Sequence, residues 1–160
     1  MATEDKFLNL INHPVQFRMY LFFKIPSAFF SGIKIKKCTA EKCVTSVPFK
    51  WFTQNPFRST YFASLAMAAE MSTGVLMLSN TYKKIPAISM LVTKMEAAYF
   101  KKATEETFFC CEDGLQIANA VSEASRSVEG QTINVRSVGK NKNGELIAEF
   151  SFTWSIKKKE

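Results

Sequence analysis

Glu70 is the single charged residue among the 24 residues between Arg58 and Lys83. Burying an ionised carboxylate without a partner is very costly. Two interpretations follow. Either Glu70 pairs with an Arg or Lys across an interface, or it borders a cavity or a subunit boundary, where its pKa rises toward neutrality. In the second case the carboxylate can act as a general base or a nucleophile.

Asn55 lies fifteen residues before Glu70 and directly precedes Pro56. An Asn before Pro is common in turns, which is one interpretation of this residue. The other is that its amide orients a water molecule or a substrate carbonyl. A predicted helix follows, and the first backbone N–H groups of a helix are unpaired and carry a partial positive charge. Such groups can stabilise a developing oxyanion.

The helix around Glu70 is predicted to run from about Ser59 to Ser79, with Ser59 or Thr60 as its N-cap. Three- and four-residue spacing places small residues beside the carboxylate, on a face formed by Ala63, Ala66, Thr73, Gly74 and Met77. This face leaves room for a ligand, so Thr73 is a candidate substrate contact.

Residues 61–79 are also long enough to cross a bilayer. A carboxylate at the centre of such a span costs about 2.5–3.5 kcal/mol on insertion scales. The many small residues suit close packing of a helix on a sheet instead. We therefore expect no transmembrane segment.

Alternation of apolar and polar residues predicts strands on both sides of this helix. The runs 33–39 and 43–52 indicate a β-hairpin in which Val47, Phe49 and Trp51 share one face, with Pro48 at an edge or a bulge. Residues 87–103 and 104–114 read as two strands, although 92–103 alone would also suit a helix. Residues 115–128 have helical spacing, and 131–140 with 145–159 form a hairpin.

The N-terminal part predicts two helices, 3–12 and 14–24, separated at Pro14. The Phe-rich stretch 20–30 that follows has three interpretations: it packs on the domain as a cover, it bounds an acyl tunnel, or it meets a membrane surface. A central helix that is apolar on nearly all sides needs walls around it. We therefore predict an α+β fold in which a curved antiparallel sheet of about six strands wraps one long helix.

The net charge of +7 favours anionic partners, but the lysines occur in pairs and short clusters and no nucleic-acid motif is present. Four Cys, one His and no CxxC make a zinc site improbable, and no metal is expected. The first ten residues are acidic where a signal peptide is basic. These features predict a cytoplasmic protein with reduced thiols.

The order of hairpin, Asn, long helix and wrapping strands resembles the hotdog-fold thioesterase superfamily, most closely its PaaI-like acyl-CoA thioesterases. The segment NPFRSTYFASLAMAAEMSTG, residues 55–74, resembles an uncharacterised branch of that superfamily. The resemblance implies one domain, 1–160, with a helical extension over 1–32 and a hotdog core over 33–158.

PaaI-like enzymes carry an Asn fifteen residues before an acidic residue of the central helix. The resemblance therefore implies that Glu70 is base or nucleophile toward a thioester, that Asn55 positions water or substrate, and that the backbone N–H near Phe62 binds the thioester oxygen. Tyr61, Phe62 and Ala63 stand where the family often has His-Gly-Gly. Glycine lets a ligand approach the backbone, and Phe62 crowds that approach.

The implied substrate is an acyl thioester such as acyl-CoA, with coenzyme A as part of the substrate and no separate cofactor. Four cations are candidates for the coenzyme A phosphates: Arg58, Lys83, Lys84 and Arg136. The resemblance also implies a homodimer or a dimer of dimers with sites between protomers. The alternative is a hotdog protein that binds an acyl chain or lipid without catalysis.

Overall fold

The structure is a computed structural model that describes residues 3–159, with side chains described from Phe7 onward. Its elements in chain order are α1 (Thr3–Asn12), α2 (Pro14–Lys24), α3 (Pro26–Ser31), β1 (Lys34–Cys38), β2 (Cys43–Val47), the 3₁₀ turn η1 (Trp51–Thr53), α4 (Phe62–Thr81), β3 (Ile88–Tyr99), β4 (Thr107–Cys111), α5 (Gly114–Arg126), β5 (Gln131–Asn141) and β6 (Leu146–Lys158).

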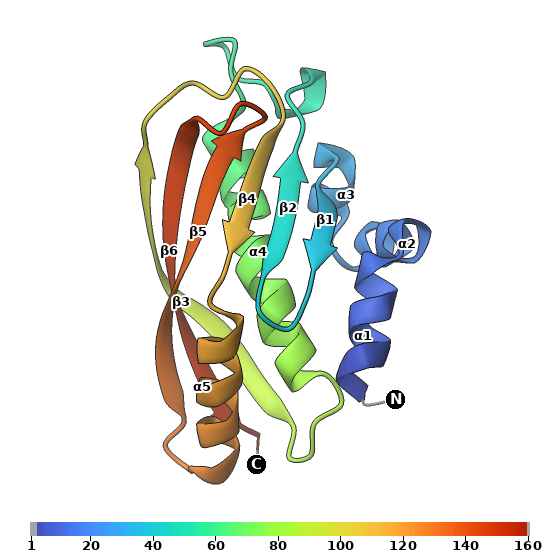
Figure 1. Cartoon of the computed structure of the whole chain (residues 1–160), viewed down its shortest axis with the longest axis vertical. Helices are drawn as coiled ribbons and strands as arrows, with labels where there is room; N and C mark the ends of the chain where they lie inside the picture. Colours follow the sequence, from blue (N-terminus) through green and yellow to red (C-terminus); the bar gives the residue numbers. More distant parts are fainter. Residues whose placement is uncertain (1–2, 160) are drawn as a thin grey trace.

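The six strands form one antiparallel sheet in the order β1-β2-β4-β5-β6-β3 (Figure 1). The sheet curves around α4, which contacts β2, β4, β5 and β6. The strands β1 and β3 are its two edges. The predicted α+β fold, a long central helix wrapped by a curved six-stranded sheet with helices at the N-terminus, is confirmed.

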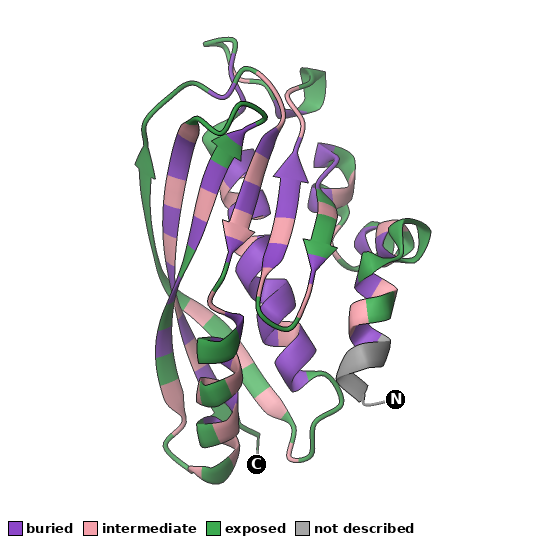
Figure 2. Ribbon diagram, in the orientation of Figure 1, coloured by how far each residue is buried: buried purple, intermediate pink, exposed green. Residues whose placement is uncertain are grey.

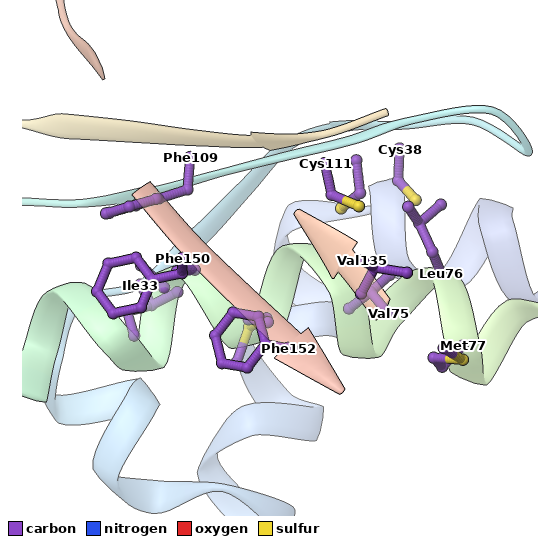
Figure 3. Packing of buried hydrophobic residues seen from close by; sticks show 14 of the residues in the cluster. Ile33, Cys38, Val75, Leu76, Met77, Phe109, Cys111, Val135, Phe150 and Phe152 are labelled. Carbon is purple, nitrogen blue, oxygen red and sulfur yellow. The ribbon is translucent and has the colours of Figure 1, made fainter. Parts of the chain in front are cut away.

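The C-terminal strand β6 supplies much of the wall against α4. Its residues alternate between buried and partly exposed positions (Figure 2), as the sequence predicts. The rings of Phe109, Phe150 and Phe152 pack between the sheet and α4, with centroids of successive rings 5.7 and 6.0 Å apart (Figure 3). Alternation places one complete face of the strand in the core because successive side chains point to opposite faces.

Hydrogen bonds from hydroxyl side chains on both elements anchor α4 to the sheet. Thr45 Oγ1 donates to the carbonyl of Ala68 at 2.6 Å, and the hydroxyls of Ser72 and Ser137 lie 2.8 Å apart. Among the described helices, α4 alone is long and apolar enough to cross a membrane, but 67% of its most apolar window is buried in the fold. Its apolar character is therefore explained by packing inside the sheet.

The start of α4 differs from the prediction. The helix begins at Phe62 after the N-cap Tyr61, so Ser59 and Thr60 are not the cap. The hydroxyl and the backbone N–H of Thr60 both donate to the carbonyl of Ala103. The hydroxyl of Ser59 donates to Asn55. Both hydroxyls are used by the loop before the helix, which delays the helix start.

The strand β2 is shorter than predicted. It ends at Val47 because Pro48 has no N–H to donate and β2 pairs on both sides, with β1 and β4. The chain then turns through η1, and Trp51 is 82% exposed. The prediction that Val47, Phe49 and Trp51 share one face of this strand is therefore wrong beyond Val47. Residues 92–103 do not form a helix: most of them belong to β3.

Candidate active site

Glu70 borders a small cavity of about 70 Å³. The other lining residues are apolar except for one tyrosine: Phe17, Tyr20, Leu21 and Ile25 from α2 and its end, and Met71, Gly74, Val75 and Leu78 from α4. No described residue donates a hydrogen bond to the carboxylate or forms an ion pair with it. Within one chain, Glu70 is thus a partly buried acid beside a small cavity.

Burial raises the pKa of the Glu70 carboxyl above its ordinary value of 4.5. Tyr20 is the one other titratable residue in the cavity lining. Gly74 makes room for the carboxylate, since a Cβ on that residue would lie 2.8 Å from Glu70 Oε1. The absence of a side chain at position 74 therefore allows the carboxylate to occupy this place.

A half-exposed stripe of α4 leads from the helix start to Glu70. Phe62 is exposed and Ala63, Ala66 and Met67 are partly buried, and three- and four-residue spacing places them in line with Glu70. Beyond Glu70, residues of α2 and its end cover the same face, where they line the cavity together with Gly74 and Leu78. Glu70 lies at the boundary between the covered half and the open half of this face.

Asn55 organises the loop before α4. Its Oδ1 accepts hydrogen bonds from the backbone N–H of Phe57 at 2.9 Å, the backbone N–H of Ser59 at 3.3 Å and the Ser59 hydroxyl at 3.2 Å. The side-chain oxygen of Asn55 therefore has the role in a turn that the sequence suggests for this residue. Its Nδ2 has no acceptor among the described residues, so the amide nitrogen is available to a ligand.

Asn55 lines a pocket of about 520 Å³ at the start of α4. Tyr61 and Phe62 line it from the helix, and the chain leaving β3 closes it with Tyr99, Phe100, Lys101, Lys102 and Ala103. The backbone N–H groups of Phe62 and Ala63 have no acceptor among the described residues. Phe62 lines this pocket, which we call the helix-start pocket, and Ala63 follows it on the helix outside the lining. The pocket therefore lies at the unpaired N–H groups and the positive end of the α4 dipole.

The helix-start pocket and the Glu70 cavity are separate in one chain. They share no lining residue. Eight residues separate Phe62 from Glu70, which corresponds to about 12 Å along a helix. The structure brings Asn55, Tyr61 and Phe62 together but does not bring Glu70 to them.

Thr73 lies on the sheet side of α4, outside the lining of either site. Its hydroxyl donates to the carbonyl of Glu70 at 2.9 Å and accepts from the indole nitrogen of Trp154 at 3.3 Å. The Thr73 hydroxyl thus uses its proton within α4 and uses its oxygen to join α4 to β6.

The four cations suggested for coenzyme A lie in three places. Arg58 belongs to the Asn55 loop, with a φ of 57°, and is exposed. Lys83 and Lys84 follow the opposite end of α4, about 30 Å from its start for a helix of this length. Arg136 is on β5, where it forms an ion pair with Glu149. Arg58 alone of the four is near the helix-start pocket.

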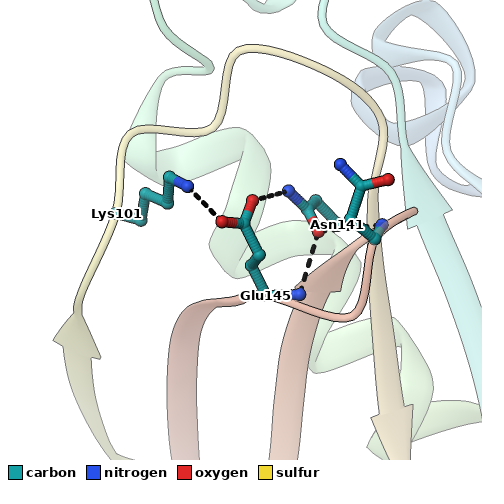
Figure 4. Close-up of polar contacts among 4 residues, drawn as sticks. Lys101, Asn141 and Glu145 are labelled. Carbon is teal, nitrogen blue, oxygen red and sulfur yellow. Dashed lines mark hydrogen bonds and ion pairs between the residues drawn. The ribbon is translucent and has the colours of Figure 1, made fainter.

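Two cations of the helix-start pocket, Lys101 and Lys102, were not singled out as site residues. Lys101 pairs with Glu145, which also accepts from Asn141 (Figure 4). Lys101 thereby lowers the pKa of Glu145. Lys102 has no ion-pair partner among the described residues. The sequence shows the lysine pair, but the return of the chain past the helix start is a tertiary feature.

The thiols do not form a nucleophilic site. All four cysteines are free, and burial raises the pKa of Cys111 to about 12. His13 caps α2, with its Nδ1 accepting from the backbone N–H of Gln16. In the described part of the chain no group of three or more His, Cys, Asp or Glu residues could hold a metal ion.

Comparison with solved structures identifies the architecture. A Pseudomonas aeruginosa protein described as a "Probable Thioesterase" of unknown function superposes with a TM-score of 0.76 at 18% identity, over 91% of this chain and 97% of that one. A Haemophilus influenzae thioesterase gives 0.67 at 10% identity, over 90% of each chain. The Escherichia coli PaaI protein of the phenylacetic acid degradation operon gives 0.64 at 12% identity, over 91% of this chain and 94% of that one.

At these identities the likeness establishes the hotdog fold shared with thioesterases. No curated protein sequence matches this chain. One family does match, over residues 15–156, which is most of the chain. The chain belongs to the family described as "Domain of unknown function (DUF4442)".

Proposed function

We propose that the protein hydrolyses an acyl thioester, with acyl-CoA as its substrate, and that it works as a cytoplasmic homodimer in which Glu70 is the general base. The observation that carries the proposal is the Glu70 carboxylate itself: it is partly buried, it has no partner among the described residues, burial raises its pKa, and it lies beside a cavity on the central helix of a hotdog fold. A base with a raised pKa accepts a proton more readily near neutral pH.

The chemical step is a hydrolysis by activated water. The Glu70 carboxylate removes a proton from water as the water oxygen forms a bond to the thioester carbonyl carbon. The N–H groups of Phe62 and Ala63 stabilise the resulting oxyanion. When the intermediate collapses, the C–S bond breaks and the thiolate takes the proton from the Glu70 carboxylic acid, leaving a free acid and a thiol.

A homodimer joins the two halves of the site. The edge strand β3 has unpaired backbone groups and exposed apolar side chains, including Leu91 at 65% exposure and Met95. Pairing of two β3 edges would also bring partner groups toward the half-exposed stripe of α4. In this arrangement Glu70 of one protomer faces the helix-start pocket of the other protomer. The distance of about 12 Å between Glu70 and the pocket of its own chain then no longer prevents the reaction.

The substrate assignment rests on the shape and charge of the helix-start pocket. Its lining includes Tyr99, Phe100 and Lys102, which offer apolar surface and a cation without an ion pair in the described chain. Arg58 lies on the same loop as Asn55. Lys102 in the lining and Arg58 on the neighbouring loop suit the phosphates of coenzyme A. The Asn55 amide nitrogen, which has no acceptor among the described residues, would donate to a substrate oxygen.

A second candidate function is the binding of an acyl chain or lipid without catalysis. The aromatic ring of Phe62 favours it, because this ring stands where the resembling enzymes often have glycine and crowds the approach of a thioester to the backbone N–H. The Glu70 cavity of about 70 Å³ holds a few atoms of either ligand, so the bulk of an acyl chain would lie elsewhere. Native mass spectrometry separates the two: a co-purified lipid that is never turned over supports binding alone.

The direct test is Glu70→Gln, which keeps the shape of the side chain and removes the base. We expect kcat on a panel of acyl-CoA substrates to fall by about 10³-fold, with the circular dichroism spectrum unchanged. Glu123→Gln, on the exposed face of α5, is the matched control and keeps full activity. Full activity of the Glu70→Gln protein would remove Glu70 from the mechanism.

A further inference from the structure

Aromatic rings from three segments form a continuous ridge on the surface. The aromatic ridge consists of Phe22 and Phe23 of α2, Phe29 and Phe30 of α3, and Trp51 and Phe52 of η1. Neighbouring ring centroids lie 5.1 Å apart for Phe22–Phe23 and for Phe22–Phe29, 5.3 Å for Phe29–Phe30 and 6.2 Å for Phe30–Phe52. Contacts between rings thus connect elements that are distant in sequence.

The ridge is exposed although it is apolar. Phe23 is 69% exposed, and Phe22, Phe30 and Phe52 are also exposed. The same segment turns other side chains inward, since Tyr20, Leu21 and Ile25 line the Glu70 cavity. The Phe-rich stretch therefore divides into an inner side that covers α4 and an outer side that no described residue covers.

Positive charge accompanies the ridge. Residues 7–69 contain eight Lys or Arg and one acidic residue, Glu41. Lys24 follows Phe23 in the chain and Lys50 precedes Trp51, and neither forms an ion pair in the described part of the molecule. The guanidinium of Arg18 lies 3.9 Å from the centroid of the Phe29 ring.

A groove of about 750 Å³ continues this surface along α2 and β1. Its lining includes Arg18, Lys34 and Lys50 beside apolar Val15 and Met19, and it contains no acidic residue. The apolar groups of the groove and the ridge are thus bordered by Arg18 and Lys50, which form no ion pair with a described carboxylate, and by Lys34, whose charge contributes to the lowered pKa of Glu106.

The position of the ridge leaves it open in the proposed dimer. The helix α2 contacts β1, which is the sheet edge opposite β3. A second copy of the chain does not suit this surface, because two-fold contact would place the same cations against one another. An anionic surface with an apolar layer beneath it complements both features.

We infer that the aromatic ridge docks the protein on the surface of an anionic lipid bilayer. The rings of Phe22, Phe23, Phe30, Trp51 and Phe52 enter the boundary between headgroups and acyl chains, and Arg18, Lys24 and Lys50 contact lipid phosphates and carboxylates. The α2 helix thereby lies along the membrane surface, and its inner side remains on α4.

The test is co-sedimentation of the full-length protein with vesicles. Phosphatidylcholine vesicles with about one-third phosphatidylserine are compared with phosphatidylcholine alone. We expect binding to the anionic vesicles at least about tenfold tighter, and a blue shift of tryptophan emission on binding. Trp154 is buried, so the shift is absent in Trp51→Phe while binding remains.

Two double variants separate the apolar and the charged contributions. Phe23→Ser with Phe52→Ser lowers vesicle affinity at least about tenfold, whereas Leu115→Ser with Val128→Ser, equally exposed residues elsewhere, leaves it unchanged. Lys24→Gln with Lys50→Gln lowers it about 25-fold, and Lys140→Gln with Lys157→Gln does not.

Three results would overturn the inference. One is equal binding, or none, to anionic and neutral vesicles. Another is unchanged vesicle binding by the Phe23/Phe52 variant at unchanged circular dichroism. The last is a Phe23/Phe52 variant whose solution mass drops below that of the wild type, which would show that the ridge is an interface between copies of the chain.

Discussion

The two halves of the candidate site differ in what each lacks. The Glu70 cavity holds an unpaired carboxylate but only about 70 Å³ of space. The helix-start pocket has about 520 Å³, the unpaired N–H group of Phe62 and one cation without an ion pair in the described chain, Lys102, but no carboxylate in its lining. Within one chain the carboxylate and the larger pocket are thus separate, so the proposed hydrolysis requires a second protomer to bring them together.

The two halves of the site also differ in the interactions that fix their residues in place. The Glu70 side is closed by apolar residues of α2, so its carboxylate is tuned by burial alone. The helix-start side is held by hydrogen bonds, with Asn55 Oδ1 accepting three of them and Thr60 donating to Ala103. The first half depends on packing and the second on loop geometry.

The largest effect is expected from separating the protomers. Leu91→Lys with Met95→Lys places charges on the β3 edge, which blocks edge pairing. We expect the mass measured by light scattering to fall from dimer to monomer and kcat/KM to fall by at least about 100-fold, because Glu70 no longer meets the partner subunit's Phe62.

Val128→Lys, on a loop outside the sheet edge, is the control and stays dimeric and active. A fully active monomer would show that one chain assembles the site by itself. In that case a conformational change within one chain, and not a dimer, would have to bring Glu70 to the helix-start pocket.

Displacing the carboxylate within its own cavity should have the next largest effect. Gly74→Ala puts a Cβ 2.8 Å from the present position of Glu70 Oε1, so the side chain must move. A misplaced base lowers kcat by about 10- to 100-fold. Steady-state kinetics test this, and Ala66→Gly, on the open stripe, is the control; an unchanged kcat for Gly74→Ala would mean that the precise carboxylate position is immaterial.

On the other half of the site, Asn55→Ala removes the acceptor of three hydrogen bonds. We expect a loss of about 1–3 kcal/mol in the free energy of unfolding and a decrease of about tenfold in kcat/KM. Urea denaturation and kinetics measure the two effects. Asn55→Asp keeps the acceptor but loses the amide nitrogen, so restored stability with low activity would assign a substrate contact to Nδ2.

The smallest expected effect is a change in how the free energy of unfolding depends on pH in the Glu70→Gln variant. Because burial raises the pKa of Glu70, the folded state holds this proton more tightly than the unfolded state. The contribution of the Glu70 carboxyl to the free energy of unfolding is therefore fully present below the pKa that Glu70 has in the unfolded chain. This contribution is lost as the pH rises through the higher pKa that Glu70 has in the folded protein. Glu70→Gln removes this loss, so the variant should be more stable than the wild type at neutral pH and not at low pH.

Urea midpoints measured across the pH range test this prediction, with each unit of raised pKa corresponding to about 1.4 kcal/mol. An identical pH dependence of wild type and Glu70→Gln would mean that the carboxyl is not buried in solution. The catalytic role would then lose its physical basis.

Much of the architecture follows from local patterns. The alternation of Phe150, Phe152, Trp154 and Ile156 predicts the inner face of β6, and all four are buried. The apolar central helix predicts surrounding walls, and the sheet provides them. The helix start was misjudged because Thr60 bonds to Ala103, a contact over 43 residues that no local pattern contains.

The sequence by itself determined that a lone carboxylate would sit on a buried helix, since hydrophobic spacing and the absence of other charges are local properties. Tertiary structure decided which surface faces that carboxylate: α2 packs over it, and the chain leaving β3 builds the larger pocket two turns away. The reason is that burial and cavity shape arise from contacts between distant segments, which residue types and spacing do not specify.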